Sequence, residues 1–126
     1  MGDRSVLEWK HIVRPGADEC HVRDHSMNGG DLLKLVIDTA ACFTSVREDT
    51  GGMMPYICGN FRKPVWAMDE LVITVRLEKE GNTSRTYSFT VERTIAYAND
   101  GTATATVLGT PELCIDGTLV MVCKPH

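Results

Sequence analysis

The run from Asp31 to Arg47, "DLLKLVIDTAACFTSVR", has the length of a helix and contains no Gly or Pro. Its apolar residues recur on most sides of a 3.6-residue period, which is typical of a helix buried over much of its circumference. Asp38 is a polar residue at the centre of this run, and a pair of glycines, Gly29 and Gly30, precedes it.

After residues 51–52 the pattern changes to the two-residue period of strands. Residues 71–79 and 87–95 alternate apolar and polar positions on either side of the turn "EGNTS", which predicts a long antiparallel hairpin. Residues 53–61 predict a further strand. Pro55 and Gly59 place that strand at a sheet edge or at a bulge.

Residues 98–111 are rich in Gly and Thr and predict a loop, followed by a last strand over residues 112–123. A first strand is expected over residues 6–13. The order of elements predicts an α+β fold, in which one long helix is wrapped by a five-stranded antiparallel sheet. With 126 residues, 43% of them hydrophobic, we expect a single domain over residues 1–126.

Composition restricts the partners. The formal net charge is -4, and the thirteen Lys and Arg residues form no basic stripe, so we expect no nucleic acid partner. No apolar run approaches the roughly 20 residues that cross a bilayer, and the first residues lack the apolar centre of a signal peptide. We therefore expect a cytoplasmic protein without a membrane partner. The five Cys residues lie far apart with no C-x-x-C pair, which predicts neither a disulfide framework nor a metal site.

Three motifs make the chain resemble the hotdog-fold acyl-CoA thioesterases: "NGGDLLKLVIDTAACF", "NFRKPVWAMDEL" and "KEGNTSRTYSFTVERT". The phrase "GNTSR" and the ending "DGTLVMVCKP" resemble more closely one branch, the 3-aminobutyryl-CoA and β-alanyl-CoA ammonia-lyases. The chain departs from that branch where the lyases carry glutamates, because Cys42 and Asn60 stand at those positions. Met68 also stands in a turn where glycine is usual.

The glycine pair has a chemical interpretation. The N–H groups in the first turn of a helix lack intrahelical acceptors and carry the positive end of the helix dipole. Gly29 or Gly30 is thus a candidate oxyanion hole for a thioester carbonyl, and Gly30 is our prediction. The resemblance implies that Asp38, eight residues later, activates water or attacks the carbonyl. The alternative is an ordinary surface pair between Lys34 and Asp38 at i,i+4 spacing.

Two polar residues before the helix are further catalytic candidates. Asn28 is a helix cap or turn residue, or else it orients the water or the carbonyl. His25 is a candidate general acid or base, and the alternative is a structural or exposed loop residue.

Coenzyme A enters as part of the substrate, and we expect no bound cofactor. Asn82 and Arg85 of the "GNTSR" turn and the pair Arg62 and Lys63 are candidates for binding its phosphates by charge-assisted hydrogen bonds. The alternative is that these charges only make the hairpin soluble.

The sequence thus favours an enzyme that hydrolyses a short acyl-CoA or acyl-carrier thioester. The alternatives are a β-aminoacyl-CoA ammonia-lyase and a noncatalytic acyl-CoA-binding or structural subunit. One sheet around one helix leaves strand edges open, so we expect a homodimer or a dimer of dimers with each site built from two chains.

Overall fold

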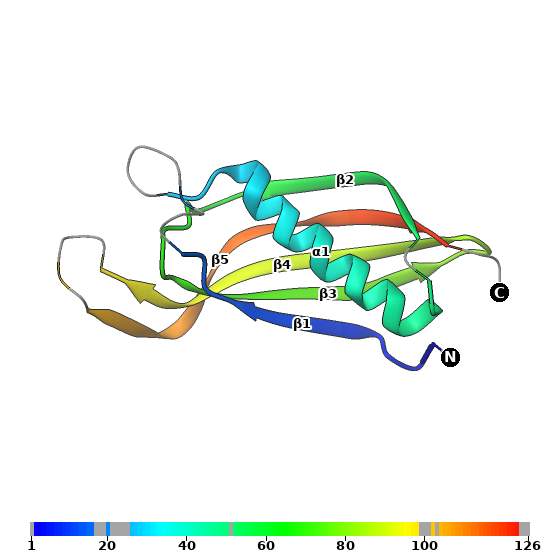
Figure 1. Ribbon diagram of the computed structural model, residues 1–126, viewed down its shortest axis with the longest axis horizontal. Coiled ribbons are helices and arrows are strands. Elements are labelled where there is room, and N and C mark those ends of the chain that lie inside the picture. The colour runs from blue at the N-terminus through cyan, green and yellow to red at the C-terminus, as the bar shows by residue number, and fades with distance from the viewer. Residues whose placement is uncertain are drawn as a thin grey trace.

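The structure is a computed structural model that describes residues 2–16, 20, 26–50, 52–98, 102 and 104–123. Its elements in chain order are β1 (Glu8–Val13), α1 (Gly29–Glu48), β2 (Met53–Phe61), β3 (Glu70–Glu80), β4 (Ser84–Tyr97) and β5 (Ala105–Val122). All strands pair antiparallel in one sheet of order β1-β3-β4-β5-β2. The helix lies along one face of this sheet (Figure 1). The predicted architecture, one long helix wrapped by a five-stranded antiparallel sheet, is confirmed.

The core lies between one side of α1 and the concave face of the sheet. Val36, Ala40 and Phe43 of the helix are fully buried against apolar residues of the central strands. The Phe43 ring packs 5.0 Å from the Tyr87 ring, and the Tyr87 hydroxyl shares a 2.8 Å hydrogen bond with Thr44. Burial raises the pKa of Tyr87. The helix is therefore fixed in both position and rotation against β4.

The strand that carries Pro55 is an edge strand, as its sequence predicts. β2 pairs only with β5, and its register shifts between Met53 and Tyr56, on either side of Pro55. A proline cannot donate a ladder hydrogen bond, so an edge or an irregularity is where it is tolerated. Tyr56 and Phe61 remain exposed along this edge.

The predicted loop over residues 98–111 is wrong in its second half. β5 begins at Ala105 and continues through Pro111. Residues Tyr97 and Ile95 at the end of β4 pair with Ala105 and Val107. The Thr-rich segment reads as a loop because its side chains are small and exposed, but the ladder with β4 satisfies its backbone. The extended end of the β4–β5 hairpin projects beyond the helix (Figure 1). The register shifts between Arg93 and Ile95, which accommodates Pro111.

The backbone of the turn before β3 shows why glycine is the usual residue at position 68. Met68 has a φ of 71°, in the left-handed region that favours glycine. Asp69 is buried and holds the turn together, because its carboxylate accepts hydrogen bonds from the backbone N–H of Trp66 at 3.1 Å and of Tyr97 at 2.9 Å. Arg93 donates a third hydrogen bond to it at 3.0 Å.

The C-terminal end of α1 lies in a cluster of charged side chains, here called the helix-end cluster and formed by Arg4, Arg47, Glu48, Glu80 and Arg85. The Glu48 carboxylate accepts hydrogen bonds from Arg85 Nε at 3.0 Å and from Arg47 Nη1 at 2.8 Å. Burial opposes ionisation of Glu48, but hydrogen bonding and charge from the arginines outweigh it, so its pKa lies below the ordinary value. The cluster ties the helix to the β3–β4 hairpin and to the N-terminal segment.

Candidate functional site

The first turn of α1 is built around Asn28 and two glycines. Asn28 is the N-cap residue, and its side-chain oxygen accepts a 2.7 Å hydrogen bond from the N–H of Gly30. The first intrahelical bond runs from the Leu32 N–H to the Asn28 carbonyl at 3.0 Å. Within the described part of the chain, the N–H groups of Gly29 and Asp31 have no acceptor. The helix-cap interpretation of Asn28 holds in this structure, and the N–H of Gly30 is already engaged.

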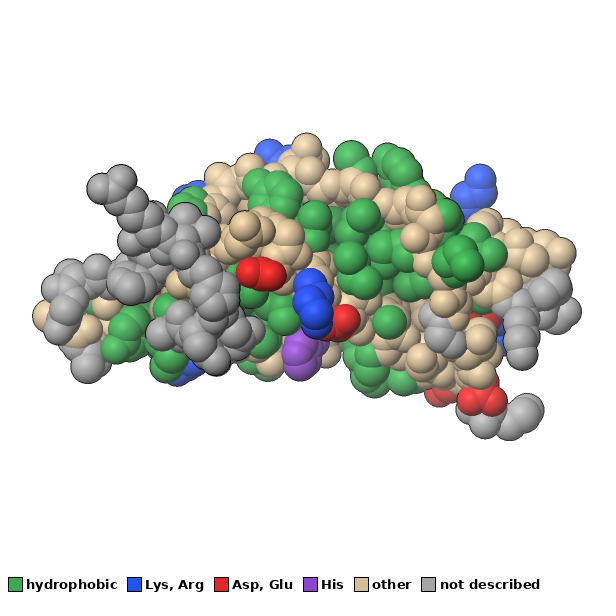
Figure 2. Space-filling view, turned by 45° about the horizontal axis from the view of Figure 1, so that its top comes forward, with side chains coloured by type: hydrophobic (Ala, Val, Ile, Leu, Met, Phe, Trp, Pro, Cys, Tyr) green, Lys and Arg blue, Asp and Glu red, His purple; other side chains and the backbone are tan. Residues whose placement is uncertain are grey.

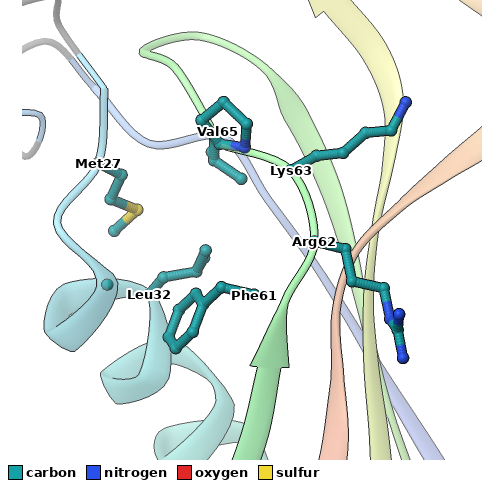
Figure 3. A pocket seen from close by; sticks show the side chains of 8 residues that line it. Met27, Leu32, Phe61, Arg62, Lys63 and Val65 are labelled. Carbon is teal, nitrogen blue, oxygen red and sulfur yellow. The ribbon is translucent and has the colours of Figure 1, made fainter.

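A hollow of about 280 Å³ opens beside this turn and is here called the first-turn hollow. It is lined by Met27, Gly29, Leu32, Phe61, Arg62, Lys63, Pro64 and Val65. Met27, Leu32 and Phe61 point toward one another across it (Figure 3). A Cβ atom on Gly29 would lie 3.2 Å from the Phe61 ring, so glycine allows the helix start to approach β2 closely.

The cationic residues of this hollow direct their charges away from its apolar centre. The head groups of Arg62 and Lys63 point away from Leu32 and Phe61 in Figure 3. Arg62 pairs with Asp116 at 3.0 Å, and Lys63 pairs with Glu112 at 2.8 Å. These contacts lower the pKa of both carboxyls: hydrogen bonding to Arg62 is the main cause for Asp116, and hydrogen bonding to Lys63 for Glu112. Because both cations remain about half exposed, the pairs are weak and open to exchange.

Asp38 lies on the outward side of the helix. Its side chain is 60% exposed and pairs with Lys34 Nζ at 2.9 Å. It also lines a second hollow, of about 270 Å³, with Trp9, His11, Leu35, Thr39 and Cys42, here called the Asp38 hollow. Figure 2 shows acidic, basic and His side chains close together on this face, among hydrophobic ones. Asp38 therefore has the expected surface partner and yet is not closed off from a cavity.

The two hollows have no lining residue in common. Gly30 and Asp38 are eight residues apart, which is about 12 Å along the helix and roughly 80° around it. In a single chain, the first-turn N–H groups and the Asp38 carboxylate therefore do not converge on one small reacting group.

The candidates for phosphate binding fall at opposite ends of the helix. Arg62 and Lys63 lie by its first turn, whereas Asn82 and Arg85 lie at the β3–β4 turn by its last, and twenty residues of helix span about 30 Å. Asn82 is exposed. The Arg85 side chain is 0% exposed and donates to Glu48 and to the carbonyls of Gly81 and Ser84, so it presents no surface to a phosphate. His25 lies outside the described residues.

His11 is a residue of the Asp38 hollow that sequence reasoning missed. It lies on β1, distant in sequence from the glycine pair and the helix. His11 alternates with Trp9 and Val13 on one face of the predicted first strand, and this alternation could have identified His11 as a candidate. Without the tertiary structure, nothing in that alternation indicates which helix residue lies opposite.

No protein-family model matches the chain, and no curated protein matches its sequence. Solved structures do match it. The β-alanyl-CoA:ammonia lyase from Clostridium propionicum superposes with a TM-score of 0.86 at 19% identity, over 100% of this chain and 93% of that one. An acyl-CoA hydrolase from Staphylococcus aureus, solved with butyryl coenzyme A and coenzyme A, gives 0.75 at 16% identity, over 100% and 71% of the two chains. The PaaI protein of the E. coli phenylacetic acid degradation operon gives 0.71 at 15% identity, over 97% and 78%.

The chain has the hotdog fold. In this hotdog domain, the described residues include no helix that is long and apolar enough to cross a membrane. They also include no group of three His, Cys, Asp or Glu side chains placed to hold a metal ion.

Proposed function

We propose that this hotdog domain is an enzyme that hydrolyses the thioester of a short acyl-CoA or acyl-carrier substrate. The main support for this proposal is the exposed Asp38 carboxylate, which lines the Asp38 hollow. Asp38 acts as the base that takes a proton from water, or as the nucleophile that attacks the carbonyl carbon. The likeness to a hydrolase solved with butyryl coenzyme A supports this substrate class.

The surface pair with Lys34 does not exclude this role. Both side chains are largely exposed, and exposed pairs of this kind contribute only about 0–1 kcal/mol. A substrate that enters the Asp38 hollow can therefore separate the pair at little energetic cost. The same weakness leaves Arg62 and Lys63 able to leave their carboxylate partners for the phosphates of coenzyme A.

The oxyanion donors come from the first turn of a helix. We propose that the N–H groups of Gly29 and Asp31 serve together with, or in place of, that of Gly30, because Asn28 occupies the Gly30 N–H. Because the first turn and Asp38 of one chain lie about 12 Å apart along the helix, the site combines Asp38 of one copy with the first turn of another. A homodimer or a dimer of dimers follows from this requirement.

Elimination of ammonia from a β-aminoacyl-CoA is the second candidate. The β-alanyl-CoA:ammonia lyase is similar over 93% of its own length, which favours it. Removing the α-proton and the amine requires proton transfer at two atoms, and Cys42 stands where the lyases carry a glutamate. We therefore place hydrolysis first.

The test is a paired assay of the wild-type protein and Asp38→Asn with short saturated, enoyl and β-aminoacyl-CoA esters. Free thiol, ammonia and the 2,3-double bond are recorded separately. Asp49→Asn is the matched control, because it makes the same substitution at an exposed carboxylate at the other end of the same helix.

We expect thiol release by the wild-type protein and by Asp49→Asn, and a loss of at least about 10²-fold in Asp38→Asn. Ammonia exchange without thiol release would move the chain to the lyase reaction. No turnover with any ester would contradict both enzymatic proposals and leave a binding protein.

A further inference from the structure

His11 lies on the core-facing side of its strand. β1 pairs with β3 in a register that sets Trp9 opposite Val75, His11 opposite Ile73, and Val13 opposite Leu71. Directly opposed residues of an antiparallel pair share a face of the sheet. Val75, Ile73 and Leu71 are all fully buried core residues, so the His11 side chain is directed to the same side as the core.

At residues 11 and 12 of β1, the polar side chain therefore lies on the core-facing side of the sheet and the apolar one on the outer side. His11, a polar residue, takes a core-facing position between two residues that pack against the core, Trp9 and Val13. Ile12, on the opposite face, is 63% exposed. The His11 side chain is exposed, so it takes a core-facing position and still reaches solvent. Exposure alone is ordinary for a His on an edge strand. What sets His11 apart is that it shares a hollow with the Asp38 carboxylate.

The core-facing position brings His11 to the wall of the Asp38 hollow. From α1, the groups that face this hollow are Asp38, with Lys34 paired to it, and the thiol of Cys42. From β3, the residues opposite and diagonal to His11 are Ile73, Leu71 and Val75, which carry no charge. Within the described residues, the His11 imidazole has no hydrogen-bond partner, so both of its nitrogens are open to a substrate or water.

Two side chains that can carry protons line the same hollow of about 270 Å³, Asp38 from α1 and His11 from β1. A carboxylate on one wall and an imidazole on the other form a base and an acid that face the same small volume.

We infer that His11 is a second proton-transfer residue of the Asp38 site, an inference that rests on the proposed function. The water oxygen bonds to the thioester carbon while its proton passes to the Asp38 carboxylate. The C–S bond breaks, and the imidazolium of His11 gives its proton to the departing thiolate. The Asp38 proton then passes to the neutral imidazole, and this restores both groups and leaves a carboxylic acid and a thiol.

The experiment measures thiol release from pH 5.5 to 9 for the wild-type protein, His11→Gln, His25→Gln and Asp38→Asn. Lys10→Gln is the matched control, because Lys10 is exposed on the other face of the same strand. Thermal melting verifies that His11→Gln, a substitution of an exposed side chain, is folded. We expect His11→Gln to lower kcat about 10²-fold with little change in KM. We also expect it to abolish the fall in rate on the alkaline side that the wild type and Lys10→Gln show.

Three outcomes would overturn the inference. A wild-type profile in His11→Gln, with Asp38→Asn inactive, removes His11 from proton transfer and leaves the proposed hydrolysis standing. Loss of the alkaline limb in His25→Gln instead assigns the acid to the other histidine. Absence of thiol release by the wild-type protein overturns the proposed function and this inference together.

Discussion

Replacing Glu48 with Gln should strongly destabilise the domain, because it removes the central anion of the helix-end cluster. The Glu48 side chain is only 4% exposed, and those of Arg47 and Arg85 are 2% and 0% exposed. Removing one partner of a buried ion pair leaves an uncompensated charge and costs about 3–5 kcal/mol. Glu80 lies 3.3 Å from Arg85 and is partly solvent-exposed, so it compensates in part. We therefore expect a loss of about 3 kcal/mol.

The measurement is chemical and thermal unfolding of Glu48→Gln beside Glu78→Gln, an exposed glutamate on the same strand as Glu80. For a chain of this size a loss of about 3 kcal/mol lowers Tm by roughly 10–15 °C, whereas Glu78→Gln should remain within about 0.5 kcal/mol of the wild type. Adding Arg85→Met to Glu48→Gln should recover part of the loss, because it removes the buried Arg85 charge that Glu48→Gln leaves without its main partner.

The effect should also depend on pH with a definite sign. The pKa of Glu48 is lower in the folded state than its ordinary value of 4.5, so its contribution is complete above that value. The contribution is lost as the pH falls through the folded-state pKa. The difference in stability between wild type and Glu48→Gln should therefore be full at pH 7 and shrink in acid. A loss below about 1 kcal/mol, or a difference that does not vary with pH, would refute the structural role assigned here to Glu48 and Arg85.

Two further predictions, one on backbone conformation and one on close packing, are tested by the same unfolding measurements. Met68→Gly should be more stable than Met68→Ala by about 1–2 kcal/mol, because both lose the side chain but only glycine relieves the φ of 71°; equal stability would show that the turn is unstrained. Gly117→Ala should unfold the domain or cost more than about 3 kcal/mol, because the new Cβ would lie 2.1 Å from the Cys58 carbonyl oxygen and 2.6 Å from the Phe89 ring. Gly109→Ala, whose Cβ would meet nothing within 4 Å, should be close to neutral, and a similar cost at both positions would contradict the packing described for Gly117.

Side-chain conformation and contacts between distant residues limited what the sequence could predict about the site. Asn28 and Gly30 could be recognised as a helix start, but which acceptor the Gly30 N–H finds depends on the rotamer of one side chain. Arg85 looked available because it lies in a charged turn. Its burial depends on Glu48, which is 37 residues away in sequence and adjacent only after the helix packs on the sheet.

The sequence by itself determined the fold, because period and spacing are local properties. The lack of Gly and Pro from Asp31 to Arg47 predicted most of α1, and two-residue alternation predicted the β3–β4 hairpin. Pro55 predicted an edge or a bulge for β2, which pairs only with β5. The one misread segment, residues 105–111, forms a strand only because the end of β4 supplies its partner.

Only the tertiary structure decided which polar residues share a space. Asp38 and His11 lie 27 residues apart, and the register of β1 on β3 together with the rotation of α1 brings them to one hollow. The same packing places Asp38 and the first turn in separate hollows and carries Asn82 and Arg85 to the far end of the helix. Such distances depend on how the elements pack against one another. The pattern of apolar and polar residues along the chain predicts only which faces of the elements are buried.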